Sequence, residues 1–206
     1  MKFEDWEPHY TAILDYFCFE RTDDEEAARI LADLADRDDI DLLRSLCSGR
    51  TVTVCGNAPG LAGELDRVEG MVFAADAAAE VLHNHGIHPD AIFTDLDGAT
   101  DIFIDVNRAG TVMVVHAHGD NIPLLRHWVP RFPGPLVRTT QASPLPRVHN
   151  FGGFTDGDRA VFAAEDLGAK EVRIIGFDLD DRSVDPVKRG KLFWARRLLH
   201  LIGHDL

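Results

Sequence analysis

Two aspartates separated by one residue, Asp95 and Asp97, follow a short apolar segment and precede Gly98. In an extended segment, residues two positions apart face the same side of the chain, so both carboxylates are expected to point together from a sheet edge. Like charges this close repel each other unless a cation lies between them. Mg²⁺ prefers hard oxygen ligands and is commonly shared between carboxylates and substrate phosphates. The pattern predicts a magnesium site, with an acidic surface turn as the plainer alternative in a chain rich in aspartate.

Other acidic residues stand at comparable positions. Asp76 follows another apolar segment, where it either caps the next helix or contacts the ligand of the Asp95 site. Asp120 comes shortly after His116 and His118, two histidines that would share one face of a strand. No third nitrogen or sulfur ligand accompanies them, which disfavours zinc. Asp120 is therefore expected to be the third carboxylate of the magnesium site.

Two glycine-containing turns are candidates for contact with a ligand. Gly56 and Asn57 form a turn between an apolar segment and a helix, a setting in which backbone N–H groups approach phosphates. The turn matches neither GxGxxG nor a Walker A motif, so it fits an ordinary tight turn equally well. Gly152 and Gly153 precede another helix and would also let a ligand approach the backbone.

Basic residues near these turns suit a phosphorylated ligand. Arg159 follows the Gly152-Gly153 pair, and Lys188 and Lys191 lie three residues apart at the start of the last helical segment. Residues at that spacing share one helix face and can reach the same phosphates. The alternative is a pair of solvated surface charges. Asp178 ends the last apolar segment and is either a site residue or a surface acid.

From residue 51 onward, short apolar segments alternate with amphipathic segments of helical length. The expected strands are Thr51–Cys55, Met71–Ala75, Ala91–Phe93, Thr111–His116, Leu136–Arg138 and Glu171–Ile175. The expected helices are Ala77–His85, Ile102–Arg108, Asn121–Val129, Asp156–Leu167 and Lys188–Ile202. Continuously apolar strands in this alternation predict an α/β fold, a Rossmann-like doubly wound, mostly parallel sheet with helices on both faces.

The chain before residue 51 has a helical pattern. Apolar residues recur at three- and four-residue steps from Trp6 onward, as on one face of a helix. A second helix is expected to begin at a capping Thr22 and to continue until Gly49 ends it. The expected organisation is an N-terminal helical segment, 1–49, which offers an apolar surface for a homodimer, and an α/β catalytic domain, 50–206.

The sheet also predicts where the candidate residues meet. In open parallel sheets, ligands bind beyond the carboxyl ends of the strands. Most of the candidate polar residues directly follow an expected strand, so they are expected to converge on one edge. These residues are Gly56, Asn57, Asp76, Asp95, Asp97, His118, Asp120 and Asp178.

Composition excludes several classes of protein. The chain has 35 acidic and 21 basic residues and a net charge of -14, which repels nucleic acid. No apolar stretch is long enough to cross a bilayer, and the acidic N-terminal sequence is unlike a signal peptide. The three cysteines form no CxxC pair. A cytoplasmic location with reduced thiols is therefore expected.

The excess of aspartate over lysine favours adaptation to high salt. The only lysines are Lys2, Lys170, Lys188 and Lys191. Because salt screens the repulsion among surface acids, the melting temperature is expected to rise between low and molar KCl. Thermal unfolding followed by circular dichroism tests this, and a flat or falling melting temperature would remove the halophilic interpretation.

Five motifs in order resemble a known family. They are GNAPGL, AADAAAEVLHNHGIHPDAIFTDLDG, VHAHGDN, NFGGFTDGDRAVFAAEDLGAKEVRIIGFD and KRGKLFWARRLL. This set resembles the archaeal 6-hydroxymethyl-7,8-dihydropterin diphosphokinases, called MptE-like, from Thr51 to the end of the chain. The core is also similar to thiamine pyrophosphokinases through Asp76, the segment GIHPD and the Asp95-Leu96-Asp97 motif. The glycine-rich element GGFTDGD departs from the thiamine enzymes, and no counterpart of their C-terminal β-sandwich is expected.

The resemblance implies an enzyme that uses ATP, Mg²⁺ and a hydroxymethyl-dihydropterin, and that makes a pterin diphosphate and AMP for folate or methanopterin biosynthesis. It implies that Asp95, Asp97 and Asp120 hold the metal, with Asp120 and Asp178 as candidate general bases. The ATP-contacting residues it implies are Gly56, Asn57, Asp76, Arg159, Lys188 and Lys191. The pterin-contacting residues it implies are His118, Asn121, Gly152, Gly153 and Thr155.

Three other functions fit parts of the same pattern. The segment from Asp95 to Thr100 is similar to the nucleophile motif of haloacid-dehalogenase-like phosphatases, in which the first aspartate is phosphorylated. Ala99 displaces the threonine from its place in that motif. The two aspartates also fit a glycosyltransferase that holds a nucleotide sugar through a metal. A module that binds ATP without releasing AMP is the non-enzymatic alternative.

Overall fold

A computed structural model describes the whole chain, residues 1–206. Its N-terminal helices are α1 (Phe3–Phe17), α2 (Arg21–Asp33) and α3 (Ile40–Cys47). Its strands are β1 (Thr51–Cys55), β2 (Met71–Ala75), β3 (Ala91–Thr94), β4 (Val112–Ala117), β5 (Leu136–Thr140) and β6 (Glu171–Ile175). Its other α-helices are α4 (Ala78–Asn84), α5 (Asp101–Arg108), α6 (Ile122–Trp128), α7 (Asp156–Asp166) and α8 (Pro186–Leu201). Short 3-10 helices are η1 (Leu61–Gly63), η2 (Leu65–Arg67) and η3 (Val129–Arg131).

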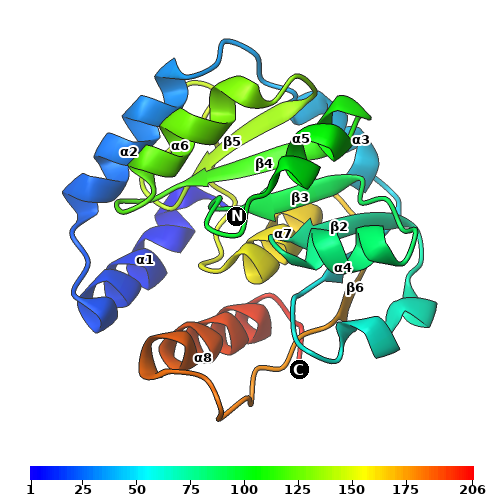
Figure 1. The fold of residues 1–206 in the computed structure, drawn as a ribbon. Helices are drawn as coiled ribbons and strands as arrows, with labels where there is room; N and C mark the ends of the chain where they lie inside the picture. Colours follow the sequence, from blue (N-terminus) through cyan, green and yellow to red (C-terminus); the bar gives the residue numbers. More distant parts are fainter.

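The six strands form one sheet in the order β5-β4-β3-β2-β1-β6, and all neighbouring pairs are parallel. The sheet begins with β1, the following strands are added one by one out to β5, and the chain then returns to place β6 on the other side of β1 (Figure 1). The predicted Rossmann-like, doubly wound sheet is confirmed. The direction of winding reverses between β1 and β6, the place where such folds commonly bind ligands.

Helices cover both faces of the sheet, and each face has its own hydrophobic core. Successive strand residues point to opposite faces, so in β4 Val112 and Val114 belong to one core and Met113 and Val115 to the other. Helices α1, α3, α7 and α8 contribute to the first core, and α2, α4, α5 and α6 to the second. Burial on both faces explains why the inner strands β2, β3 and β4 are apolar at nearly every position.

The helix predicted to run from Thr22 to Gly49 is two helices, so that prediction is wrong. A buried arginine of β5 fixes the break between α2 and α3. The Arg138 guanidinium donates hydrogen bonds to the backbone carbonyls of Ala32, Ala35 and Arg37. Such donors satisfy the carbonyls that a helix leaves free at its end, and they hold the chain in a non-helical course there.

The N-terminal segment is packed into the sheet's own cores. Trp6, Tyr10 and Ile13 of α1 are fully buried in the same core as the strands and α7. Thr22, predicted as the cap of α2, lies inside its first turn, and Glu20 occupies the N-cap position. The division of the chain into two parts at residue 49 stays a prediction.

The molecular surface carries one aromatic cluster where α1 lies beside α8. The rings of Tyr16 and Phe193 stack with centroids 6.2 Å apart, and both side chains are about half exposed. A homodimer contact at the N-terminal helices stays a prediction. None of the helices combines the length and the apolar character needed to cross a membrane.

Candidate active site

A cavity of about 700 Å³ opens at the carboxyl ends of the strands. The loops after β1, β2, β3, β4, β5 and β6 all contribute to its lining, together with the start of α7 and one side of α8. The eight residues predicted to converge on this edge all line it: Gly56, Asn57, Asp76, Asp95, Asp97, His118, Asp120 and Asp178. The convergence follows from the parallel sheet, because every strand ends at the same edge.

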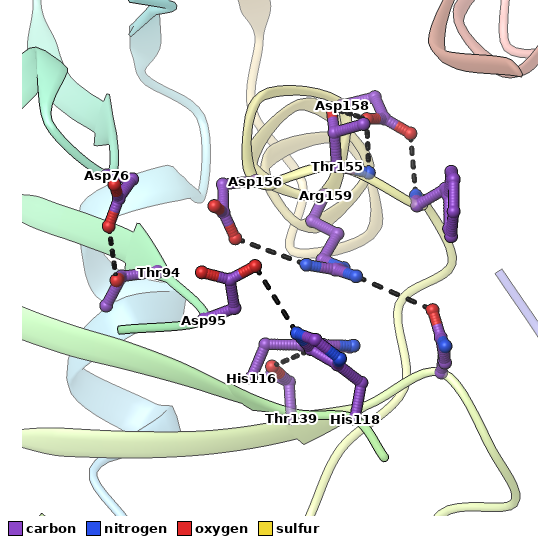
Figure 2. Close-up of polar contacts among 12 residues, drawn as sticks. Asp76, Thr94, Asp95, His116, His118, Thr139, Thr155, Asp156, Asp158 and Arg159 are labelled. Atoms are coloured by element: carbon purple, nitrogen blue, oxygen red, sulfur yellow. Dashed lines mark hydrogen bonds and ion pairs between the residues drawn. The ribbon is translucent and has the colours of Figure 1, made fainter. Parts of the chain in front are cut away.

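Three carboxylates from separate elements meet on the floor of the cavity. Asp76 follows β2, Asp95 follows β3 and Asp156 is the first residue of α7, and one oxygen from each lies within 4.8 Å of the others. Figure 2 shows these carboxylates turned toward one another. Burial, followed by the charge of Asp95, raises the pKa of Asp156 well above its usual range. Carboxylates this close repel one another, and a bound cation would relieve that repulsion.

Asp76 is held in an unusual backbone conformation. Its φ angle is +46°, in the left-handed region, and its side chain accepts a hydrogen bond of 2.6 Å from the Thr94 hydroxyl. Gly98 lies directly against it, since a Cβ at that position would be 2.0 Å from the Asp76 carboxylate. Burial raises the pKa of Asp76 to about 6, although the Thr94 hydrogen bond works against the rise. Asp76 precedes α4 without capping it, because Ala77 is the N-cap.

The predicted extended geometry of the Asp95 and Asp97 pair is wrong. Leu96 has a φ of +75°, and the Asp97 amide donates to the Asp95 carboxylate at 3.2 Å, so the segment turns immediately after β3. The turn keeps the two acids close, and burial together with the Asp95 charge raises the pKa of Asp97. Only Asp95 belongs to the three-carboxylate cluster. Asp97 lies at the rim of the cavity as the more exposed of the pair.

His118 forms an ion pair with two carboxylates. Its Nε2 lies 3.4 Å from Asp95 and its Nδ1 contacts Asp120. Burial opposes a charge on the ring, but hydrogen bonds to Asp120 and Asp95 outweigh it and raise the pKa of His118 to about 9. Burial also opposes the charge of Asp95, but the His118 bond and the Arg159 charge hold its pKa below the ordinary carboxyl range.

Asp120, predicted as the third metal ligand, lies outside the three-carboxylate cluster. Its side chain is 87% exposed and pairs with His118, and that hydrogen bond lowers its pKa. Asp156 takes the third position, and the sequence reasoning missed it because Thr155-Asp156-Gly157-Asp158 has the pattern of a helix start. That pattern is present, since Thr155 and Asp158 form the capping box. The available signal was a further carboxylate at the N-terminus of a helix that follows a glycine pair.

Positive charge enters the cavity from α7 and α8. The buried Arg159 reaches Asp156 with a contact of 3.2 Å between Nη1 and the carboxylate (Figure 2). Lys188 and Lys191, in the first turns of α8, also line the cavity. These cations line the same cavity as the acidic cluster, where they would stabilise a bound anion.

The loops at the reversal of the sheet form one wall. Gly56 follows β1 and Gly176 follows β6, and the Ala58 amide donates to the Gly176 carbonyl at 2.9 Å. A Cβ at Gly56 would lie 2.6 Å from that carbonyl and from the Phe177 ring. Gly157 has the same relation to Phe177. Glycine is therefore required by close packing at both positions.

Three residues predicted to contact the pterin do not line the cavity. The Asn121 amide is buried below it, donating 2.8 Å hydrogen bonds to the carbonyls of Asp95 and His116. Gly152 packs on Phe162, and Gly153 packs on the backbone of Arg159. Asn121 and Gly153 instead contact Asp95 and Arg159, which do line the cavity.

The N-terminal segment supplies part of the lining, which the sequence did not indicate. Cys18, Phe19 and Glu20 from the α1–α2 connection border the cavity, as do Asp23 and Asp24 of α2. Nothing in their local pattern marks them, since a mixed acidic helix start is common on surfaces.

His118 makes stability depend on pH in the alkaline range. Its folded-state pKa of about 9 lies above the ordinary value of about 6.5, so its contribution is complete below about pH 6.5 and is lost as the pH rises through about 9. The contribution is up to about 3 kcal/mol. Between pH 6 and pH 10, His118→Gln should flatten the fall in the free energy of unfolding of metal-free protein, measured in urea. The exposed His127→Gln is the control, and equal slopes in the two variants would contradict this role.

Most of the residues that line the cavity fall within a region that matches a family model. The model, described as 6-hydroxymethylpterin diphosphokinase MptE-like, matches residues 26–183. That range holds the whole acidic cluster, His118 and Arg159, and it ends before the two lysines of α8.

Curated relatives align with nearly the whole chain. A protein of Methanothermobacter thermautotrophicus is 41% identical over 97% of this chain and 94% of its own length. One of Pyrococcus furiosus is 41% identical over 100% of this chain and 96% of its own. One of Methanocaldococcus jannaschii is 30% identical over 98% and 96%. Each is named 6-hydroxymethyl-7,8-dihydropterin pyrophosphokinase. With a family model that covers most of the chain and relatives aligned almost end to end, this chain belongs to the MptE-like 6-hydroxymethylpterin diphosphokinase family.

Proposed function

We propose that this chain is a 6-hydroxymethyl-7,8-dihydropterin pyrophosphokinase that uses ATP as the diphosphate donor. The carrying observation is a cluster of three partly buried carboxylates in the same cavity as Arg159, Lys188 and Lys191. This arrangement suits a polyphosphate bound between a metal and cationic side chains. The names of the relatives support the pterin as acceptor. The cavity volume of about 700 Å³ lies in the usual range for small-molecule sites.

Magnesium fits the donor set of the cluster. Asp76, Asp95 and Asp156 offer only oxygen ligands, and burial, with a smaller contribution from neighbouring aspartates, raises the pKa of Asp76 and of Asp156. These residues would hold Mg²⁺, which when bound supplies charge neutralisation and orientation to the phosphates. Asp97 lines the same cavity at its rim and would add a further carboxylate oxygen there.

The reaction needs positioning and charge neutralisation more than covalent catalysis. The hydroxymethyl oxygen of the pterin attacks the β-phosphorus of ATP, the bond from that phosphorus to the α,β-bridging oxygen breaks, and AMP leaves. Arg159, Lys188 and Lys191 stabilise charge on the transferred group and on the leaving phosphate. His118 is protonated at neutral pH through its raised pKa of about 9, so it acts as a donor and does not accept the substrate proton.

The hydroxyl proton passes to a carboxylate at the cavity edge. Asp120 and Asp178 both line the cavity. Pairing with His118 lowers the pKa of Asp120 and makes it the weaker base. This pairing favours Asp178, which lies near the start of the loop after β6 and has no hydrogen-bonding partner for its carboxylate other than the nearby Asp180 amide.

The decisive experiment is incubation of the purified chain with ATP, Mg²⁺ and 6-hydroxymethyl-7,8-dihydropterin, with chromatographic separation of nucleotides and pterins. The expected products are AMP and a pterin diphosphate in equal amounts, with none in the presence of EDTA. Reactions with thiamine, or without an acceptor, are the controls. Release of inorganic phosphate instead would indicate a phosphatase, turnover of a nucleotide sugar a glycosyltransferase, and tight ATP retention without AMP a sensor. Each of these three results would contradict the proposal.

A further inference from the structure

A buried carboxylate on α2, Asp24, ties the N-terminal helices to the active site. It is 4% exposed and accepts three hydrogen bonds, from the Tyr10 hydroxyl at 2.7 Å, the Gln141 amide at 2.8 Å and the Gly119 backbone at 2.9 Å. All three donors are neutral. A buried carboxylate is costly unless hydrogen bonds replace its hydration, so this arrangement persists only because each donor is held in place.

Two of these donors belong to the site. Gly119 lies between His118 and Asp120 in the loop after β4, so its bond to Asp24 fixes the loop that pairs with Asp95. The loop sits directly on α2, because a Cβ at Gly119 would lie 2.6 Å from the Cβ of Asp23. The bond therefore fixes the position of the loop that carries His118 relative to the acidic cluster.

The second donor leads to the arginine of the cavity. Gln141 follows β5 and donates to Asp24, while its own side-chain oxygen accepts a 3.5 Å contact from Arg159. Arg159 in turn reaches Asp156 of the acidic cluster. The Trp6 indole donates to the Gln141 backbone carbonyl at 2.9 Å, which gives the same residue a second support from α1. A continuous chain of contacts thus runs from α2 to the carboxylates.

We propose that Asp24 is a positioning residue for diphosphate transfer, which places the helices α1 and α2 among the working parts of the enzyme. The proposal rests on the proposed function. Asp24 acts through His118 and Arg159, whose charges matter most when charge develops during transfer. Small displacements of such groups have large kinetic effects, since a shift of about 1 Å can cost roughly a hundredfold in rate. The loss should therefore appear in kcat.

The test compares the wild type and two variants in the AMP-release assay, at a temperature where circular dichroism shows each to be folded. Asp24→Asn keeps the shape of the side chain but turns an amide N–H group toward one of the three hydrogen-bond donors. We expect kcat to fall at least about tenfold, while the KM values for ATP and for the pterin stay within about twofold. Glu26→Gln makes the same chemical change on the exposed side of α2 and should leave kcat unchanged. A wild-type kcat for Asp24→Asn, or a change confined to KM, would overturn the proposal.

Two further measurements separate positioning from general destabilisation. Asp24→Asn and Gln141→Ala interrupt the same chain of contacts, so their effects on kcat should be strongly non-additive, whereas additive effects would overturn the proposal. If Asp24→Asn does not fold, Tyr10→Phe removes one bond only, and an unchanged kcat in that variant would overturn it. Amide exchange at Gly119, which should quicken in Asp24→Asn, tests the tie without turnover. Absence of AMP release by the wild type would instead refute the proposed function.

Discussion

Asp95→Asn is expected to lower kcat for AMP release at least about a hundredfold while leaving the protein folded. The residue belongs to the three-carboxylate cluster and also contacts His118, so the substitution removes a charge that both a metal and the histidine require. The loss should be comparable to removal of one strong electrostatic stabiliser of the transition state. Steady-state assays at saturating Mg²⁺ measure it, with circular dichroism as the test of folding.

Two matched variants sharpen this prediction. Asp66→Asn makes the same change on the exposed η2 and should behave as the wild type. Asp97→Asn should lose less activity than Asp95→Asn, because Asp97 lies at the rim and outside the cluster. Near-normal AMP release by Asp95→Asn would refute the metal site, and equal losses in both variants would show that the two acids act as ligands together.

Asp76→Asn is expected to stabilise the metal-free protein at neutral and alkaline pH. The pKa of Asp76 is raised to about 6, above its ordinary value of 3.8, mainly by burial. A carboxyl whose pKa is raised in the folded state lowers the free energy of unfolding once it is ionised. This loss of stability is absent below about pH 4, grows as the pH rises through about 6 and is complete at pH 8. The difference corresponds to about 3 kcal/mol. An asparagine oxygen still accepts the Thr94 hydrogen bond that orients the side chain.

The measurement is thermal unfolding in EDTA at pH 4.5 and pH 8. The melting temperature of Asp76→Asn should exceed that of the wild type by several degrees at pH 8, and the gain should shrink at pH 4.5. Added Mg²⁺ should raise the melting temperature of the wild type more than that of the variant, because ligand binding stabilises only a protein that retains the site. If Asp76→Asn is less stable than the wild type at pH 8 in EDTA, the assignment of the raised Asp76 pKa to burial is contradicted.

The strands and the position of the site could be predicted from the sequence. Met71–Ala75 is apolar at every position and Ala91–Thr94 at all but its last, which is the mark of strands covered on both faces. Polar residues such as Asp76 and Asp95 stand directly after such strands. In a parallel sheet all strands end at one edge, so local pattern alone places these residues together.

The composition of the metal cluster depended on the tertiary structure. The sequence favours Asp120 because it follows a strand, but its side chain is exposed and pairs with His118. The start of α7 instead brings Asp156 beside Asp76 and Asp95. Sequence spacing cannot rank these candidates, because their distances depend on strand order and on the angle at which α7 meets the sheet. The left-handed turn at Leu96 could not be predicted from the sequence either, because an unfavourable φ angle is stabilised by the residues around it in the folded protein.

The structure of the first 49 residues was decided almost entirely by distant contacts. Arg138 ends α2 from a strand about a hundred positions further along the chain, and Asp24 becomes part of the site through Gly119 and Gln141. The periodicity of this segment predicts helices, because that pattern reflects local burial on one face. Where those helices end, and which buried acid meets which loop, depends on side chains that approach only after the sheet has assembled, so no local pattern encodes it.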